Sequence, residues 1–530
     1  MTLVALPPFS MWWIGLLSPL PIAVAAWRTN RVLRTSLGAA LGTLPLWIYH
    51  HAWIADVSLA GVGPLIAYLS AWMAILVFLI ARMRRARLLP GAAIAIPTAW
   101  VGAEYVRGEI AFEGYAWFLA GHPMIESVTV SAAASIAGVY LVSWLVVSLS
   151  GIAIARRSGT SRDRRLGLAV SLVLVGLLGL SVITPGQPPA GERVRIAALQ
   201  TNVPQSNKAF PTQEQLVADF RSLIALADEA VLADADLLVT PETVLPGGLL
   251  DPEARAVIDE PFGAAMLDEQ ARLGVPMLVG CTTIAGVRFE GDRAVWDDTF
   301  NSVFLLRNGQ VDGPRYDKLQ PTPFGETLPY IQAFPWLRDA VLTIGFGASG
   351  MDFGLAKGEA PRSFRIPMHN KLVSVTTPIC FESSMAPTVR ELVNAARESG
   401  SPTDLLCVMT NDGWFGGFDA GRAMHLLQAR WRCVEHRLPM IRCANTGISA
   451  VIDREGRVID SLQAQESGVL IGETELGGPE TMYQLVGDRF GAACALLTGV
   501  GIVVSFLRGR RDRARLGDLQ ASTADSGESQ

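Results

Sequence analysis

A short strand, a cysteine and a turn follow one another in the segment Val373-Ser374-Val375-Thr376-Thr377-Pro378-Ile379-Cys380-Phe381-Glu382-Ser383. The apolar run before Cys380 predicts a strand, and the residues after it predict the start of a helix. A thiol at a helix N-terminus lies at the positive end of the helix dipole, which lowers its pKa and favours the reactive thiolate. Taken alone, a cysteine at a strand end is more often a small buried apolar residue.

Two further segments place charged side chains just after a strand. The first is Leu237-Leu238-Val239-Thr240-Pro241-Glu242-Thr243-Val244-Leu245-Pro246, in which Glu242 follows a buried strand. The second is Arg315-Tyr316-Asp317-Lys318-Leu319-Gln320-Pro321-Thr322-Pro323-Phe324-Gly325-Glu326, in which Lys318 precedes a rigid turn. Each of these segments is weak evidence by itself, because an exposed turn glutamate and a charged surface loop are common.

The region around these segments has the pattern of a water-soluble α/β domain. Apolar runs predict strands at Val194–Leu199, Leu237–Thr240, Met277–Cys281, Ser302–Leu306, Val373–Ile379, Leu405–Thr410, Met440–Ala444 and Ser449–Asp453. Helical patterns lie between several of them, for example at Glu214–Ala233 and Met385–Glu398. About 300 residues of this kind can bury a full core. The cluster Pro185-Gly186-Gln187-Pro188-Pro189 predicts a linker ahead of this domain.

The rest of the chain is strongly apolar. Half of all residues are hydrophobic and only 18% are charged. Apolar runs at 10–27, 34–54, 60–81, 88–106, 124–155, 166–184 and 489–507 are near or above the roughly 20 residues that a membrane-spanning helix needs. In the longest run, the span is expected to begin at about Gly138. One cleaved signal peptide would explain a single run of this kind, so seven runs predict a multi-span membrane domain.

Arginine clusters predict on which side of the membrane each loop between the apolar runs lies. The clusters follow alternate apolar runs, at 28–34, 82–87, 156–165 and 508–515. The loops that follow the other runs carry little positive charge. By the positive-inside rule these clusters lie in the cytoplasm, so the N-terminus and the α/β domain lie on the other side. The sequence thus divides into a membrane domain (1–185), an α/β domain (186–488), a last span (489–507) and a basic, then polar and disordered tail (508–530).

The overall composition excludes several other classes of protein. It does not fit a disordered chain, a collagen-like fibre or a small disulfide scaffold. The net charge of −5 gives no basic field for nucleic acid. The six cysteines form no CxxC pair or other recurring spacing, and the six histidines do not cluster with them, so we expect no metal site.

The three strand-end segments together, in this order, resemble the nitrilase superfamily. Two later segments strengthen the resemblance, namely Thr410-Asn411-Asp412-Gly413-Trp414-Phe415-Gly416 with the helix that begins near His425, and Cys443-Ala444-Asn445-Thr446-Gly447. The resemblance implies a four-layer α-β-β-α sandwich with a catalytic set of Glu242, Lys318 and Cys380. By residue type and position, the Phe381 N–H is a candidate oxyanion donor, Glu326 is a candidate to orient Lys318, and Glu382 is a second carboxylate beside Cys380. For the two glutamates, an ordinary turn or helix-start residue is the alternative.

The membrane part resembles the apolipoprotein N-acyltransferase family. Three segments carry this resemblance: Pro7-Pro8-Phe9, Trp100-Val101-Gly102-Ala103-Glu104-Tyr105-Val106-Arg107 and Gly114-Tyr115-Ala116-Trp117-Phe118-Leu119-Ala120-Gly121. The resemblance covers about residues 4–506. It implies transfer of a fatty acyl chain from a membrane phospholipid to the N-terminal amine of a diacylglyceryl-cysteine lipoprotein, through a Cys380 thioester and without a cofactor. It also implies a monomeric, multi-pass enzyme of the bacterial inner membrane, with a periplasmic catalytic domain and a cytoplasmic C-terminus.

Large apolar residues near the reactive segments are candidates for contact with lipid. Phe334 and Trp336 lie in the apolar stretch 328–337, which we interpret as an arm at the membrane surface, because aromatic side chains favour the interface. Trp414 and Phe415 are candidates for the opposite wall of the site. Ordinary packing of the arm against the α/β domain is the alternative.

The chain departs from the family pattern at a few positions. Thr240 and Phe381 stand where an aromatic tryptophan and a tyrosine are usual, Ala209-Phe210 replaces a further tryptophan, and seven spans are expected in place of eight. These changes affect substrate preference more than the reaction. Two alternatives remain from other classes: a membrane-tethered amidase that uses water as the acceptor, and a non-catalytic membrane scaffold.

The arginine pattern makes a direct prediction about topology. A reporter that is active only after export should be active when fused after Gln187, and a reporter that is active only in the cytoplasm should be active after Arg515. Activity assays on the two fusions in cells measure this. The reverse pattern would contradict the positive-inside assignment of every span.

Overall fold

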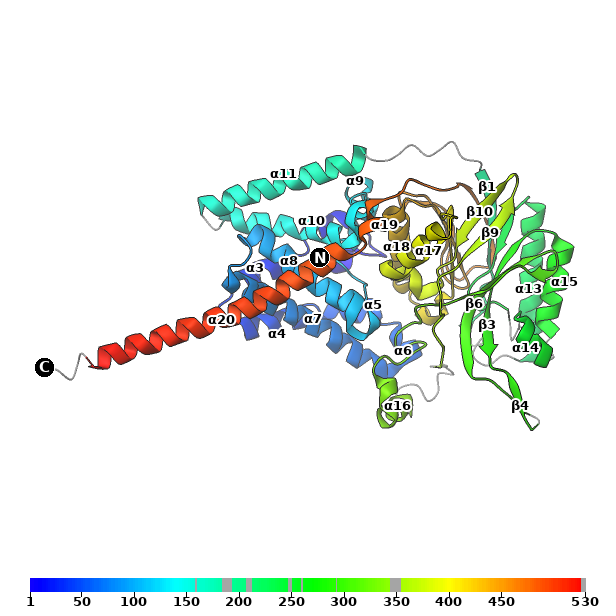
Figure 1. Cartoon of the computed structure of the whole chain (residues 1–530), viewed down its shortest axis with the longest axis horizontal. Coiled ribbons are helices and arrows are strands. Elements are labelled where there is room, and N and C mark those ends of the chain that lie inside the picture. The colour runs from blue at the N-terminus through cyan, green and yellow to red at the C-terminus, as the bar shows by residue number, and fades with distance from the viewer. Residues whose placement is uncertain are drawn as a thin grey trace.

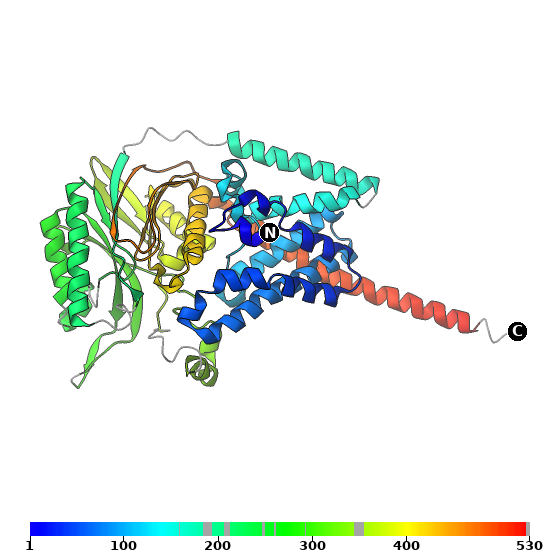
Figure 2. The same ribbon diagram turned by 180° about the vertical axis from the view of Figure 1, so that it is seen from behind.

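The computed structural model describes residues 1–157, 160–183, 193–205, 212–245, 250–258, 261–291, 293–343 and 354–525. The chain forms two parts that lie side by side, a helical domain and an α/β domain (Figures 1 and 2). The last long helix returns from the α/β domain and packs against the helical domain. The predicted linker at 185–189 lies outside the described residues.

The helical domain consists of helices of very different length. Its α-helices are α1 (Thr2–Ala5), α2 (Trp12–Gly15), α3 (Leu20–Arg28), α4 (Val32–Gly42), α5 (Leu44–His51), α6 (Ile54–Val57), α7 (Leu59–Ala86), α8 (Ala92–Tyr105), α9 (Val128–Ser131), α10 (Ala134–Arg157) and α11 (Ser161–Ile183). Short turns of other helix types lie between them, namely η1 (Val106–Ile110), η2 (Ala111–Glu113) and η3 (His122–Glu126). Among the described residues, three helices are long and apolar enough to cross a bilayer: Leu59–Ala86, Ala134–Arg157 and Arg489–Ala514.

Two of the predicted spans are broken into shorter helices. The run at 10–27 forms α2 and α3, and Pro19 and Pro21 stand at the start of α3. The run at 34–54 divides between α4 and α5 near Pro45. Proline has no backbone N–H and its ring clashes with the preceding turn, so it begins a helix more readily than it continues one. Hydropathy alone did not reveal these breaks.

The long apolar run at 124–155 is also divided, and here the sequence anticipated the position. Its first part forms η3 and α9, and the backbone of α10 is non-helical at Ala137 and Gly138, where Gly138 has φ +74°. A Cβ at Gly138 would lie 2.8 Å from the ring of Tyr483, which comes from the α/β side of the chain. The break therefore also allows a close approach between the two domains.

The last helix differs from the prediction. Helix α20 runs from Arg489 to Asp525, whereas the sequence predicted a span that ends at 507 and a disordered tail after Arg515. A helix that is already formed extends easily, because each added residue gains a hydrogen bond without a new nucleation step. The arginine-rich segment after the predicted span contains good helix formers, which favours this extension. Residues 526–530 lie outside the described residues.

The α/β domain contains two large sheets. The first has the order β15-β1-β2-β3-β6-β7, with β8 also paired to β6, and the second has the order β14-β13-β12-β11-β10-β9. The first sheet uses β1 (Arg193–Gln200), β2 (Leu237–Val239), β3 (Met277–Ala285), β6 (Asp298–Arg307), β7 (Gln310–Val311), β8 (Tyr316–Asp317) and β15 (Gly468–Glu475). The second uses β9 (Ser363–Met368), β10 (Lys371–Thr376), β11 (Leu405–Thr410), β12 (Met440–Ala444), β13 (Ser449–Ile452) and β14 (Val458–Leu462). A separate hairpin, β4 (Arg288–Glu290) and β5 (Arg293–Val295), extends away from the first sheet (Figure 1).

Helices cover the outer face of each sheet, so the domain has four layers. The remaining helices are α13 (Gln213–Leu232), α14 (Pro252–Val257), α15 (Pro261–Leu273), α16 (Pro335–Val341), α17 (Ala386–Glu398), α18 (Asp419–His436) and α19 (Met482–Val486), with short turns η4 (Ile331–Ala333), η6 (Cys380–Ser384) and η7 (Asp412–Phe415). Helices α13 and α15 share a core with the first sheet, and α17 and α18 share one with the second. A third core lies between the sheets.

Strand β11 shows how one short run supplies two of these cores. Cys407 and Met409 belong to the core between the sheets, whereas Leu406 and Val408 belong to the core under α17 and α18. Successive side chains of a strand point to opposite faces, so a continuous apolar run is the expected pattern for a strand that is buried on both sides.

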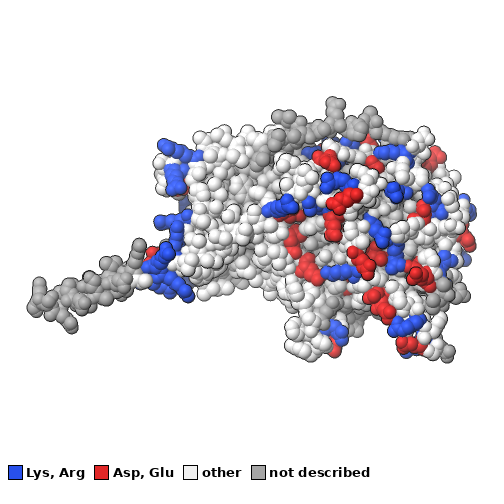
Figure 3. Space-filling view, in the orientation of Figure 1, with Lys and Arg blue, Asp and Glu red and all other residues white. Residues whose placement is uncertain are grey.

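Helix α18 connects the α/β domain to the helical domain. Ala429 and Cys433 pack toward the second sheet, whereas Leu427 and Trp431 belong to the core of the helical domain. Arg430 forms an ion pair with Glu126 at 2.5 Å, which links the two domains at the edge of this contact. The space-filling view shows charges of both signs over the α/β domain, an uncharged surface over the helical domain, and Lys and Arg gathered at its far end (Figure 3).

Candidate active site

Glu242 lies in the turn that follows β2, where its carboxylate is buried and fully engaged. One oxygen accepts hydrogen bonds from the Asn301 side chain at 2.5 Å and from Lys318 Nζ at 3.1 Å. The other oxygen accepts the backbone N–H of Asn411 at 2.8 Å. Asn301 comes from β6 and Asn411 follows β11, so both sheets fix the position of this carboxylate.

Lys318 follows β8 and is only 1% exposed. Its ammonium lies between two carboxylates, 3.1 Å from Glu242 and 2.9 Å from Glu326. Burial alone would lower the pKa of Lys318, but the two carboxylates outweigh it and hold the pKa well above its usual value. Lys318 therefore remains a cation at neutral pH. The sequence placed Glu326 in a supporting role, and the structure brings it into direct contact with Lys318.

Cys380 follows the end of β10 and begins the short turn η6. Its φ of +49° is unusual for a residue other than glycine. Burial raises the pKa of its thiol, the negative charge of Glu242 raises it further, and Lys318 opposes this increase. The sequence predicted a lowered thiol pKa from a helix dipole. That prediction is wrong, because α17 begins only at Ala386 and burial beside a carboxylate dominates. The raised pKa favours the protonated form of the thiol.

Glu382 holds the cysteine turn against the segment that carries Lys318. Its carboxylate accepts the hydroxyl of Tyr316 and the backbone N–H groups of Leu319 and Gln320, at 2.7–3.1 Å. It also accepts the N–H of Ile379 at 2.7 Å. Burial raises the pKa of Glu382 to about 7 although these donors oppose the increase. Its contacts join the two reactive segments, so it positions Lys318 relative to Cys380.

A buried histidine that the sequence analysis gave no role contacts the cysteine turn. His425 of α18 has Nε2 at 3.2 Å from the carbonyl oxygen of Cys380 and Nδ1 at 2.9 Å from Asp412 Oδ1. Arg442 of β12 donates to the other oxygen of Asp412 at 2.7 Å. Burial would raise the pKa of Asp412, but Arg442 and His425 hold it well below its usual range. Sequence spacing gave no signal for this set, since its members come from three separate elements.

The aromatic candidates fall into two groups. Phe415 is buried and packs against Trp53 and Trp117 of the helical domain, with ring centroids 4.8 and 6.1 Å away. Its neighbour Trp414 is partly exposed. Phe334 and Trp336 are 53% and 72% exposed on the arm around α16, which lies beside the helical domain (Figure 1). The structure thus places Phe415 at the junction of the domains and leaves the arm residues on the surface.

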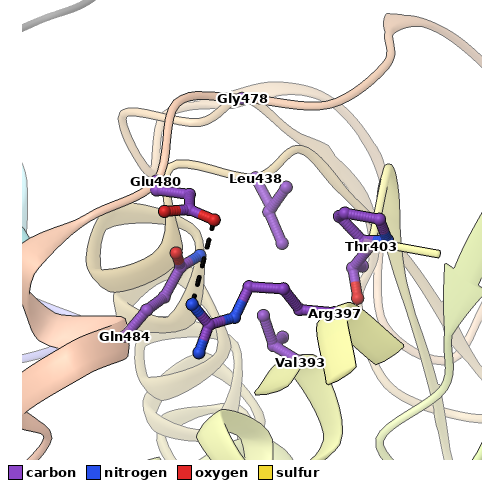
Figure 4. A pocket seen from close by; sticks show the side chains of 8 residues that line it. Val393, Arg397, Thr403, Leu438, Gly478, Glu480 and Gln484 are labelled. Carbon is purple, nitrogen blue, oxygen red and sulfur yellow. Dashed lines mark ion pairs between the residues drawn. The ribbon is translucent and has the colours of Figure 1, made fainter. Parts of the chain in front are cut away.

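Neither a metal-binding group nor a pocket elsewhere in the described part of the molecule gives a second candidate for the active site. Among the described residues, no group of three or more His, Cys, Asp and Glu side chains could hold a metal ion. A small pocket is lined by Arg397, Glu480 and their neighbours, with one ion pair of 3.9 Å across it (Figure 4). Its lining includes none of Glu242, Lys318 and Cys380.

Comparisons with known proteins cover both parts of the chain. Residues 1–152 match the apolipoprotein N-acyltransferase N-terminal domain, and residues 195–481 match the carbon-nitrogen hydrolase family. A relative from Geobacter metallireducens, named apolipoprotein N-acyltransferase, is 30% identical over 86% of this chain and 81% of its own length. One from Caulobacter vibrioides with the same name is 30% identical over 89% and 82%. A third, from Ralstonia nicotianae, is 28% identical over 96% and 91%.

A solved amidase from Nesterenkonia sp. matches 55% of this chain and 93% of its own, with 17% identity and a TM-score of 0.36. The family matches and the two sheets confirm the predicted fold class, a helical membrane domain joined to a four-layer α-β-β-α domain of the nitrilase type.

The charges around Cys380 predict opposite effects for two substitutions. Glu242→Gln removes a negative neighbour, so the thiol pKa should fall and iodoacetamide alkylation of Cys380 should rise at lower pH. Lys318→Met removes the positive neighbour, so alkylation should require higher pH. Peptide mass spectrometry would separate Cys380 from the other five cysteines, all buried.

Lys318→Met also removes the counter-charge of two buried carboxylates, at a cost of about 3–5 kcal/mol, so thermal unfolding must show that the variant is folded. If the pH dependence of Cys380 alkylation shifted in the same direction in both variants, the assigned effects of Glu242 and Lys318 on the thiol pKa would be wrong.

Proposed function

This chain belongs to the apolipoprotein N-acyltransferase family, and on that premise we propose that Cys380 carries a fatty acyl chain from a membrane phospholipid to the N-terminal amine of a diacylated lipoprotein. The observation that carries the assignment of residues is the buried contact of Lys318 with Glu242 and Glu326 beside Cys380. This arrangement supplies a base, a fixed cation and a nucleophile within one buried site.

In the first half-reaction, Glu242 accepts the thiol proton while Cys380 Sγ attacks the ester carbonyl of the phospholipid. A general base is needed because the thiol pKa is raised. The Lys318 ammonium and the Phe381 N–H stabilise the oxyanion that forms on the carbonyl oxygen. The C–O bond to the lyso-lipid then breaks, and the departing oxygen takes the proton from Glu242. The product is a Cys380 thioester.

In the second half-reaction, the lipoprotein amine attacks the thioester carbonyl. Glu242 accepts a proton from the nitrogen, the C–S bond breaks, and the proton returns to the sulfur of Cys380. The net reaction exchanges an ester for a more stable amide, and aminolysis of the thioester draws the first step forward, so the transfer requires no nucleotide to drive it. The same site with water as the acceptor would release free fatty acid, which is the tethered-hydrolase alternative.

The helical domain sets the distance of this site from the bilayer. The uncharged surface of the helical domain and the basic groups at its far end support an arrangement in which the basic end is cytoplasmic (Figure 3). We accordingly place the α/β domain in the periplasm and the C-terminus in the cytoplasm of an inner-membrane enzyme that acts as a monomer. The exposed arm with Phe334 and Trp336 would then cover the acyl chain at the membrane surface.

The thioester is the first test of this proposal. After incubation with phospholipid alone, intact mass spectrometry of the full-length protein should show an acyl adduct that hydroxylamine removes. Cys380→Ser should abolish it, because serine would at most form a hydroxylamine-resistant ester. A labile adduct that persists in Cys380→Ser would contradict the assignment of the nucleophile.

The arm gives a second test. In the double variant with Phe334→Ser and Trp336→Ser, acyl transfer from liposomes to a diacylated lipopeptide should fall about tenfold, equivalent to about 1.4 kcal/mol. The share of hydrolysed free fatty acid should rise, since water reaches the thioester more easily. Mass spectrometry of both products measures this.

The matched control for the arm is Phe289→Ser with Trp296→Ser. These two aromatic residues are also exposed, but they lie in the hairpin region of β4 and β5, away from the helical domain (Figure 1). Transfer by this control should stay near that of the unaltered protein. Equal losses in the two double variants would argue against a lipid-contacting arm.

A further inference from the structure

The peptide unit between Cys380 and Phe381 is held by its carbonyl oxygen. Ser383 Oγ donates to this oxygen at 2.8 Å, and His425 Nε2 lies 3.2 Å from it. A carbonyl oxygen can only accept, so Nε2 donates in this contact. The positive φ of Cys380 is a strained backbone conformation for a residue other than glycine, and it persists only where neighbours fix the backbone. Ser383 and His425 are two such neighbours.

The same peptide unit contains the Phe381 N–H, which the proposed mechanism uses to stabilise the oxyanion. A trans peptide is planar, so its C=O and N–H bonds point in nearly opposite directions. A donor that fixes the direction of the Cys380 carbonyl therefore also fixes the direction of the Phe381 N–H. A hydrogen bond accepted by the carbonyl further polarises the unit, which strengthens the N–H as a donor.

We infer that His425 is a positioning residue that directs the Phe381 N–H at the oxyanion through the carbonyl of Cys380. This role rests on the proposed thioester chemistry and adds a residue to it. His425 does not contact the reacting atoms in this scheme. Its effect should appear where an oxyanion forms and should be small in reactions of the thiol that form none.

The imidazole ring is itself fixed on two sides. Nδ1 lies 2.9 Å from Asp412 Oδ1 and 3.2 Å from Arg442 Nη2, and Arg442 also holds Asp412 from the opposite oxygen, so the ring cannot rotate without breaking buried contacts. Trp117 of the helical domain stacks on the ring, with centroids 6.1 Å apart and planes at 24°. The helical domain therefore contributes directly to the position of His425, beyond its role as an anchor.

The test compares two replacements of His425 in the full-length protein. His425→Gln retains an N–H donor near the place of Nε2, whereas His425→Leu retains size and removes the donor. His436 provides the matched control, because it lies on the same helix, is equally buried, and its ring nitrogens have no hydrogen-bond partner among the described residues. The control variant is His436→Leu.

Three quantities are measured for each variant. They are the single-turnover rate of thioester formation, the carbonyl stretching frequency of the isotope-labelled acyl-enzyme, and the rate of Cys380 alkylation by iodoacetamide. Complete loss of one oxyanion donor costs about 10²–10³-fold, so misdirection of the donor in His425→Leu should slow acylation at least about tenfold. The carbonyl frequency should rise, because its hydrogen bond weakens, while alkylation changes less than about twofold. His425→Gln should lie between His425→Leu and the unaltered protein in both acylation rate and frequency.

The outcomes separate this inference from the proposed function. If His425→Leu acylates at the normal rate, or if His425→Gln and His436→Leu are as impaired as His425→Leu, the positioning role is wrong. An unchanged carbonyl frequency in a slow His425→Leu enzyme would also overturn it. If Cys380→Ser still forms the labile adduct, the proposed nucleophile fails, whatever the His425 variants do.

Discussion

The buried Lys318 ammonium between Glu242 and Glu326 constrains the rest of the site. A buried cation without close counter-charges costs several kcal/mol, so the turn after β2 and the loop after β8 must meet at this point. Two carboxylates face one ammonium, and Glu242 raises the pKa of the Cys380 thiol. The same arrangement that offsets the burial of Lys318 therefore also favours the protonated form of the Cys380 thiol.

Helix α18 connects the cysteine turn to the helical domain. One face packs on the second sheet and the other on the helical domain, and its residue His425 reaches the carbonyl of Cys380. Phe415 and Trp117 fill the junction between the two domains. A shift of the helical domain would therefore move groups that contact the cysteine turn.

The eight strands predicted from apolar runs are all present, because strands buried on both faces have a strong local signal. Seven strands were not predicted, namely the short β4, β5, β7 and β8 and the longer β9, β14 and β15. Strand β14 is a largely exposed edge with Asp460 in its middle, and β15 pairs with β1 across more than 260 residues, so neither has a clear local pattern. Prolines divided two predicted spans, and the last helix continued past its predicted end.

The sequence by itself determined the two-part architecture and the identity of the candidate reactive residues, because hydropathy, arginine spacing and three strand-end motifs are local properties. Only the tertiary structure decided the direction of the Cys380 pKa shift and the contacts of His425. A thiol pKa depends on burial and on charges from other elements, and Glu242 lies 138 residues before Cys380 in the chain. The contact between His425 and the Cys380 carbonyl likewise exists only once α18 is packed between the second sheet and the helical domain.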